Sequence, residues 1–355
     1  MTSSNTNPYI QIGSRKIGAG FPVYIIAELS ANHRQDYNEA EKLVRAAKEA
    51  GADAVKLQTY TADTLTIDCQ AECFIQPPGS LWQGRTLYDL YQEGSMPWEW
   101  QPKLKKLADD LDIDLFSTPF DSTAVDFLEK MAVPAYKVAS FEIIDLPLIK
   151  KIAATGKPII MSTGMATLSE IDEAVSTART ASASQIALLK CTSAYPAKAF
   201  NMNLKTIPHL SKTFNLPAGL SDHSEGTTIP VAAVALGACI IEKHFTLSRK
   251  NGSLDRAFSL EPQEFKEMVE AVRLTEQALG QICFGPGKDE HENVNFRRSL
   301  FIVKDMKKGD ILTSKNIRSI RPGGGILPEY FDLVLGKKIK ETTSKGSALT
   351  WELIL

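Results

Sequence analysis

Residues 218–245, AGLSDHSEGTTIPVAAVALGACIIEKHF, contain the pattern that decides the fold of this chain. A short apolar run at 218–223 ends in polar residues, a helical segment follows at 227–236, and a second apolar run at 239–245 ends in the same way. Near-continuous hydrophobicity over so few residues is typical of strands that are buried on both faces of a parallel sheet. The stretch therefore predicts a strand, a helix and a second, parallel strand.

The same unit recurs toward the N-terminus. Six further apolar runs end in polar residues, at 24–30, 54–60, 114–120, 135–140, 158–164 and 186–192. Segments with helical spacing of apolar residues lie at 38–50, 122–131, 146–154, 168–181 and 262–279. Eight such units match the usual size of a TIM barrel, about 250 residues. A doubly wound open sheet would need a glycine-rich turn after the first strand, but this chain has ELSANHR there. We therefore predict an α/β fold, a (β/α)8 TIM barrel.

Two parts of the chain depart from this repeat. Residues 61–97 form a long aromatic connection after the second strand, which on a barrel would lie over the active-site face as a lid or specificity element. After Gly280 the stretch FGPGKDEHENVN is polar and glycine-rich, and short β-like runs follow it. We predict a barrel domain at 1–282, a linker at 283–295 and a small β-rich domain at 296–355, which must dock because so short a domain is marginal alone.

Composition limits the classes of partner. The chain has 355 residues and a formal net charge of -2, which gives no general attraction to nucleic acid or to an anionic membrane. The start, MTSSNTNPYI, lacks the features of a signal peptide, and no apolar run reaches the length of a membrane span. Cys191, Cys239 and Cys283 lie in or beside apolar runs and should be buried, whereas Cys69 and Cys73 should be free thiols. We expect a cytoplasmic protein.

Polar side chains end nearly every predicted strand, where TIM barrels carry their catalytic groups. They are Glu28, Lys56, Gln58, Ser117, Thr118, Lys137, Ser140, Ser162, Thr163, Thr192, Ser193, Ser221, Asp222, His223, Glu242 and His244. Each costs free energy to bury unpaired, so the set predicts a polar ligand. Lys56 and Lys137 lie inside apolar strands and need anions between them. With the neighbouring hydroxyls they suit a phosphate and a carboxylate; a Schiff-base lysine and a structural salt bridge are the competing interpretations.

Two histidines favour one of these interpretations. His223 follows the seventh predicted strand and His244 lies near the end of the eighth, so adjacent strands bring them within reach of one metal ion. Glu242 points to the same side of its strand as His244. Two imidazoles with a carboxylate or water suit Mn²⁺, Fe²⁺, Co²⁺ or Zn²⁺. Because a Schiff-base aldolase needs no metal, the pair favours metal-assisted chemistry on an anionic substrate. His33 follows the first strand, where a place at the mouth and a loop role are both open.

Several motifs together resemble those of the sialic acid synthases, which join phosphoenolpyruvate to N-acylated amino sugars. They are AELSANH, VKLQTY, STPFD, YKVAS, MSTGMA, LKCTSAYP, GLSDHS and EKHFT. The end of the chain, from FRRSLFIVKDMKKGD to IRPGGGI, is similar to the antifreeze-protein-like (SAF) domain of these enzymes. The resemblance implies a TIM barrel followed by a SAF domain. It also implies a divalent metal, Mn²⁺ before Mg²⁺ or Co²⁺, and a domain-swapped homodimer.

The resemblance also implies roles for single residues. His223 and His244 correspond to metal ligands. The positions that correspond to phosphoenolpyruvate contacts are Lys56, Thr118, Lys137, Ser140, Ser162 and Ser221. The positions that correspond to groups around the sugar or the metal-bound water are Glu28, Glu142, Tyr195 and Asp255, and Gln58 is also expected to bind substrate. Ser193 stands where many relatives have a phosphate-binding asparagine. Arg321 corresponds to an arginine that a partner subunit places over the acyl group of the sugar.

The long loop narrows the expected substrate. SLWQGRTLYDLYQEGSMPWEW, residues 80–100, is similar to the loop of the pseudaminic acid synthases within this family, whose acceptor is a 2,4-diacetamido-2,4,6-trideoxy-L-altrose. Leu81, Trp82, Leu87 and Tyr88 would suit a 6-deoxy methyl group and a second acetamido group, unless they simply pack on the barrel rim. The expected reaction yields pseudaminic acid and phosphate.

Other activities remain as alternatives. N-acetylneuraminate or legionaminate synthesis is the first, a condensation with a phosphorylated sugar is the second, and a sugar-binding module is the least favoured. Glu28, Glu242 and His223 are the expected catalytic residues. Glu28 ends the first strand facing the mouth, which suits a group that handles the proton of the water or the aldehyde.

Overall fold

The computed structural model describes residues 7–355. The prediction that the chain does not begin with a signal peptide concerns residues 1–10, of which the first six lie outside the described residues. The chain divides into two compact units, Met1–Gly280 and Gln281–Leu355. No helix within residues 7–355 is long and apolar enough to cross a membrane.

Eight parallel strands of the first unit form a closed barrel in the order β10-β3-β4-β5-β6-β7-β8-β9. They are β3 (Tyr24–Glu28), β4 (Ala54–Thr59), β5 (Asp114–Pro119), β6 (Tyr136–Val138), β7 (Ile159–Ser162), β8 (Ile186–Cys191), β9 (Ala218–Asp222) and β10 (Ile240–His244). Each lies within one of the eight apolar runs, so the predicted TIM barrel is confirmed. Pairing of β10 with β3, which sets His244 opposite Glu28, closes the barrel.

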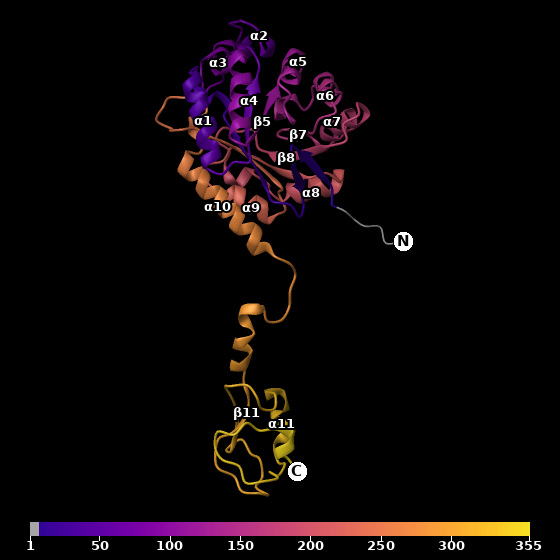
Figure 1. Cartoon of the computed structure of the whole chain (residues 1–355), viewed down its shortest axis with the longest axis vertical. Coiled ribbons are helices and arrows are strands. Elements are labelled where there is room, and N and C mark those ends of the chain that lie inside the picture. Colours follow the sequence, from indigo (N-terminus) through magenta and orange to yellow (C-terminus); the bar gives the residue numbers. More distant parts are fainter. Residues whose placement is uncertain (1–6) are drawn as a thin grey trace. The chain divides into compact units, whose positions relative to one another are not determined.

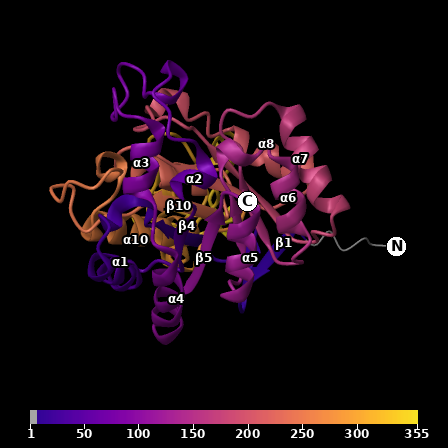
Figure 2. The same cartoon turned by 90° about the horizontal axis from the view of Figure 1, so that it is seen from above.

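Helices surround this barrel, as Figure 1 and Figure 2 show. They are α1 (Tyr37–Glu49), α4 (Gln101–Asp110), α5 (Ser122–Lys130), α6 (Leu146–Ala153), α7 (Leu168–Thr180), α8 (Thr206–Phe214), α9 (Thr228–Ala235) and α10 (Pro262–Leu279). Several begin at a carboxylate that accepts free backbone N–H groups of the first turn, as Asp36, Asp121 and Asp145 do. Their apolar faces pack on the strands in one continuous core.

A hairpin precedes the barrel and is not predicted by the sequence analysis. Strands β1 (Tyr9–Ile12) and β2 (Arg15–Gly18) pair antiparallel, and Ile10, Ile12 and Ile17 are buried in the barrel core. Gly13 lies next to the side chain of Asp114, at the start of β5. The hairpin therefore lies at the N-terminal ends of the strands, opposite the ends that carry the polar set.

The long connection after β4 contains two helices, α2 (Ala62–Leu65) and α3 (Leu87–Gly94). The Trp98 indole Nε1 donates to the Tyr60 carbonyl at 3.2 Å, and the Tyr60 ring packs against Tyr91. These contacts fix the connection to the end of β4, on the side of the barrel where the polar strand ends lie.

The second unit has a small core of its own around Leu300, Ile317 and Val334. Strands β11 (Ser299–Ile302) and β12 (Ile317–Ile320) pair antiparallel, and α11 (Phe331–Val334) follows them. Three further β-like runs of the sequence, KGDILT (308–313), KKIKET (337–342) and SALTWELIL (347–355), form isolated bridges rather than regular strands. Gly336 and Gly346 directly precede two of these runs and have positive φ, so the chain turns there.

The cysteine prediction is wrong at one position. Cys191 and Cys239 are buried as expected, but Cys283 is exposed because it follows α10 in a segment without regular structure, where its neighbours Ile282 and Phe284 are exposed as well. All five cysteines are free thiols.

Candidate active site

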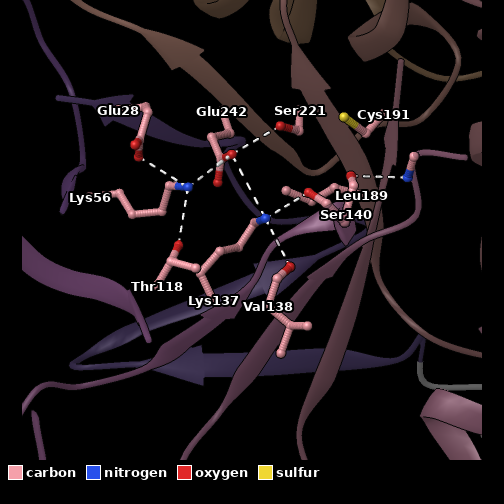
Figure 3. Close-up of polar contacts among 12 residues, drawn as sticks. Glu28, Lys56, Thr118, Lys137, Val138, Ser140, Leu189, Cys191, Ser221 and Glu242 are labelled. Carbon is pink, nitrogen blue, oxygen red and sulfur yellow. Dashed lines mark hydrogen bonds and ion pairs between the residues drawn. The ribbon is translucent and has the colours of Figure 1, made fainter. Parts of the chain in front are cut away.

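Four buried charged side chains meet at the C-terminal end of the barrel (Figure 3). The Lys56 Nζ lies 3.0 Å from Glu28 Oε2 and 3.2 Å from Glu242 Oε1. The Lys137 Nζ lies 3.9 Å from the same Glu242 oxygen. Glu242 is therefore the anion that two buried ammonium groups require, and the structural salt bridge considered from the sequence is present.

Burial and charge separate the pKa values of these groups. Burial raises the pKa of Glu28 to about 7, although Lys56 opposes this shift. Burial also acts on Glu242, but Lys137 and Lys56 outweigh it and lower the pKa of Glu242 to about 2. Burial lowers the pKa of Lys137 to about 8. Near neutral pH, Glu242 is thus a fixed anion, whereas Glu28 is able to take up or release a proton.

Hydroxyl groups surround the two lysines. Lys137 Nζ donates to Ser162 Oγ at 2.6 Å, Lys56 Nζ lies 3.4 Å from Thr118 Oγ1, and Ser221 Oγ donates to Glu242 Oε1 at 2.9 Å. This arrangement brings the predicted phosphoenolpyruvate contacts together in one place.

A small cradle lies beside this cluster. The Gly164 N–H donates to Ser140 Oγ at 3.1 Å, and a side chain at position 164 would meet the Ser140 and Ser193 hydroxyls at 2.7 and 2.3 Å. Any other residue would force both hydroxyls out of these positions, because they converge on the backbone of Gly164. Ser193, the departure from the usual asparagine, therefore still presents a donor at the ring of polar groups.

The two histidines face each other across the β9–β10 pair, with ring centroids 5.2 Å apart. His223 Nδ1 lies 3.0 Å from the Thr192 carbonyl, which leaves Nε2 free. Burial lowers the pKa of His244 well below its usual value, and its buried Nδ1 has no partner. Two neighbouring imidazoles, each with a ring nitrogen that is available, fit a divalent metal. Glu242 contacts the two lysines and does not join the histidines. Residues 7–355 contain no cluster of three or more His, Cys, Asp or Glu side chains that could hold a metal ion.

Loop residues line the outer part of the site. Tyr195 packs on His223 at 4.5 Å between ring centroids and contacts Trp82 of the long connection at 6.3 Å. Glu142 is partly buried, one of its oxygens has no hydrogen-bond partner, and burial raises its pKa to about 7. Gln58 Nε2 donates to Glu28 Oε1 at 2.9 Å. Tyr195, Glu142 and Glu28 are among the residues predicted to surround the sugar or the metal-bound water, and Gln58 of β4 is a predicted substrate-binding residue.

Sequence reasoning missed several residues of the site. Phe258, from the segment after β10, packs on both histidines, and Ser30 donates to the Asp255 carboxylate. Their sequence context gives no signal, because both depend on the segment after β10 returning over the mouth. His33 has a loop role: it is buried against Trp100. Arg321 belongs to the second unit, and its role stays a prediction.

A buried ion pair lies behind the histidines. Side chains alternate along a strand, so Asp222 and Lys243 point out of the barrel where their neighbours His223 and His244 point in. Lys243 Nζ donates to Asp222 Oδ2 at 2.6 Å and to the Ser224 carbonyl, and both charged side chains are fully buried. The two residues are register partners. A buried pair rarely stabilises more than an apolar pair would, so we infer that it fixes the β9–β10 register.

The fold and site together define a TIM-barrel enzyme with a buried anion site. The model of the NeuB family matches residues 43–283, and the SAF domain model matches residues 297–355. The chain belongs to the NeuB family, the resemblance to the sialic acid synthases is confirmed, and the C-terminal domain is a SAF domain.

Known proteins of this family are similar over nearly the whole chain. Pseudaminic acid synthase from Helicobacter pylori is 44% identical over 338 residues, which cover 93% of this chain and 97% of that protein. N,N'-diacetyllegionaminic acid synthase from Campylobacter jejuni is 39% identical over 316 residues, with coverages of 88% and 94%. The crystal structure of N-acetylneuraminic acid synthetase from Leptospira borgpetersenii, in complex with citrate, has a TM-score of 0.72 at 32% identity and covers 82% of this chain and 97% of that chain.

Lys243→Met should lower the free energy of unfolding by about 3–5 kcal/mol, because it leaves the Asp222 carboxylate buried without its cation. The double variant Asp222→Leu/Lys243→Met removes both charges and should recover much of that loss. Urea unfolding followed by circular dichroism measures both. If the double variant loses as much free energy of unfolding as the two single variants, Lys243→Met and Asp222→Leu, lose in sum, the two residues do not act as a pair.

Proposed function

We propose that this enzyme condenses phosphoenolpyruvate with 2,4-diacetamido-2,4,6-trideoxy-β-L-altropyranose to give pseudaminic acid and phosphate. The observation that carries the proposal is the meeting of two buried lysines, a ring of hydroxyls and two neighbouring imidazoles at one end of the barrel. The identity with a pseudaminic acid synthase over nearly the full length supports the choice of product.

Phosphoenolpyruvate is a small trianion, and its phosphate and carboxylate need the lysines. Lys56 and Lys137 supply the charge, and the hydroxyls of Ser140, Ser162 and Ser193 supply donors beside it. Ser221 and Thr118 complete the ring. Glu242 holds both ammonium groups in place, so the lysines are oriented before the substrate arrives.

His223 and His244 would hold a divalent metal, Mn²⁺ in our proposal with Mg²⁺ or Co²⁺ as alternatives, and the remaining positions would be open to substrate or water. When bound, the metal supplies Lewis acidity toward the aldehyde oxygen of the open-chain sugar. The Thr192 carbonyl fixes the tautomer of His223, and Phe258 keeps bulk water from both rings.

The reaction then joins carbon 3 of phosphoenolpyruvate to the aldehyde carbon of the sugar. Water adds at carbon 2, and phosphate leaves as the C–O bond to that carbon breaks and the ketone forms. One proton of the water ends on the aldehyde oxygen, which becomes a hydroxyl group, and the other leaves with the phosphate. Glu28 is the group that accepts a proton of that water in this proposal, because its pKa of about 7 allows proton transfer in either direction near neutral pH. Gln58 orients Glu28 through its 2.9 Å hydrogen bond.

The sugar would lie along Tyr195 toward Trp82. A cavity of about 410 Å³ opens beside Trp82, lined also by Leu81, Leu254 and Arg256. Apolar and polar lining in one cavity suits a sugar that carries both a methyl group and a second acetamido group. Glu142 and Asp255 would accept hydrogen bonds from its hydroxyl or amide groups.

We infer a domain-swapped homodimer in which a partner's second unit brings Arg321 to the sugar. The barrel rim supports this arrangement, because the loops after β6, β7 and β8 expose large apolar side chains. They are Phe141, Ile144, Met165 and Phe200, between 57 and 78% exposed. Exposed apolar patches of this kind mark interaction surfaces.

The five free thiols further suit a cytoplasmic enzyme, which cell fractionation would check.

A panel of acceptors tests the proposed substrate. Phosphate release should be fastest with the diacetamido L-altrose, by at least about tenfold over N-acetylmannosamine and the diacetamido D-sugar of legionaminate synthesis, since buried polar groups discriminate strongly when left unpaired. Steady-state assays with phosphoenolpyruvate and Mn²⁺ measure this. A preference for the D-sugar would instead support legionaminate synthesis, for which a relative at 39% identity is the specific argument.

Removing the metal or one ligand tests the histidine pair. Chelator should abolish turnover and Mn²⁺ should restore it, and His244→Ala should reduce turnover by more than about a hundredfold, since loss of even an outer-shell partner costs up to that much. Electron paramagnetic resonance of free Mn²⁺ should show tight binding by the parent enzyme and weak binding by the variant. Undiminished Mn²⁺ binding by a folded His244→Ala protein would contradict this role.

Mixed subunits test the swapped dimer. His244→Ala and Arg321→Ala proteins should each be inactive alone. A heterodimer contains one barrel with both histidines that receives an intact Arg321 from its partner, so co-expression should restore roughly a quarter of the parent activity in a random dimer mixture. No recovery in verified heterodimers would mean that Arg321 does not act across subunits.

A further inference from the structure

The turn after β3 holds Ser30 in an unfavourable backbone conformation. Its φ is 45°, in the left-handed region that residues other than glycine enter only at a cost in free energy. The side chain is 5% exposed, so the hydroxyl must find its partners inside the protein. Glycine would adopt this conformation without the penalty. An outlier of this kind beside an active site is a reason to ask what the side chain does.

The Ser30 hydroxyl links two side chains of the proposed sugar site. Gln58 Nε2 donates to Ser30 Oγ at 3.1 Å, while also donating to Glu28 Oε1 at 2.9 Å. Ser30 Oγ in turn donates to Asp255 Oδ2. The Gln58 amide donates to both sides and Ser30 passes its own proton on to Asp255, so one continuous chain of hydrogen bonds joins Glu28, Gln58, Ser30 and Asp255. It joins the ends of β3 and β4 to the segment after β10.

Asp255 depends on this turn for its orientation. It lies outside any regular element, directly before the short turn Arg256–Phe258. Among the residues that the structure describes, Ser30 is the only side-chain donor to its carboxylate, and the Ala31 N–H, at 3.4 Å, is the only backbone donor. Without the hydroxyl, a mostly buried carboxylate would keep one long hydrogen bond and lose its fixed direction.

We propose that Ser30 is a positioning residue for the acceptor sugar, acting by fixing Asp255 and Gln58 as a rigid pair of polar groups. The inference rests on the proposed function, which assigns Asp255 to the sugar and has Gln58 orient Glu28. It predicts that the hydroxyl, and not the backbone conformation at residue 30, determines recognition of the acceptor.

Two variants separate the hydroxyl from the backbone. Ser30→Ala and Ser30→Gly both lack the hydroxyl, but only glycine relieves the left-handed conformation. Both should raise KM for the amino sugar by about ten- to hundredfold, the effect of one hydrogen bond to a charged group, and leave KM for phosphoenolpyruvate roughly unchanged. The glycine variant should have the higher Tm of the two.

Ser182 provides the matched control. It is also a serine with positive φ, 77°, but it is exposed and lies between α7 and β8, at the opposite end of the barrel. Ser182→Gly should likewise have a higher Tm than Ser182→Ala, and both should keep the parent values of both KM constants. The control thus reports the backbone effect alone.

The double variant Ser30→Ala/Asp255→Asn tests whether Ser30 acts through Asp255. If it does, Ser30→Ala should change KM for the sugar much less in the Asp255→Asn background than in the parent. An undiminished effect there would overturn the proposal. So would a parent-like KM in Ser30→Gly with an impaired Ser30→Ala, since the backbone would then be the cause.

The parent enzyme is assayed first with the acceptor panel, so that a failure of the proposed function can be told apart from a failure of the role of Ser30. No turnover of any amino sugar by the parent enzyme would overturn the proposed function, and the role of Ser30 with it. Turnover by the parent together with unchanged KM values in both Ser30 variants would overturn the role of Ser30 alone.

Discussion

The site depends on the burial of two ammonium groups, Lys56 and Lys137, at one end of a closed barrel. A low-dielectric interior does not tolerate two such charges without an anion, and Glu242 lies between them, 3.2 and 3.9 Å from the two nitrogens. Their field keeps Glu242 ionised. Glu28, paired to only one lysine, has a raised pKa instead. One constraint thus produces both an oriented pair of cations and a carboxyl group able to transfer a proton.

Side chains along β9 and β10 alternate between the two faces of the sheet, so each face carries a different set of residues. The inward residues, His223, Glu242 and His244, line the candidate site, whereas the outward Asp222 and Lys243 join the same strands on the opposite face. A shift of one residue in register would turn the histidines into the helix layer. The ion pair and the candidate metal site therefore require the same register.

Loops supply what the strands do not. Tyr195, Trp82 and Phe258 come from three different connections and meet over the histidines. Asp255 reaches the mouth from the segment after β10, where Ser30 holds it. In the proposed reaction, the strands would place the groups for anion binding and proton transfer. The loops would face the part of the substrate that differs between sugars, and substrate choice would then depend on them.

The sequence by itself determined the barrel and most strand-end residues of the site, because strands buried on both faces leave short apolar runs that end in polar residues. It did not determine the partners of those residues. Glu242 meets Lys56 only because closure of the barrel sets β10 beside β3, and Ser30 meets Asp255 only because a loop returns over the mouth. The packing of the hairpin β1–β2 on the barrel core likewise depends on contacts between segments far apart in the chain. Local pattern fixes which face of an element is buried, but only tertiary structure decides which distant group lies against it.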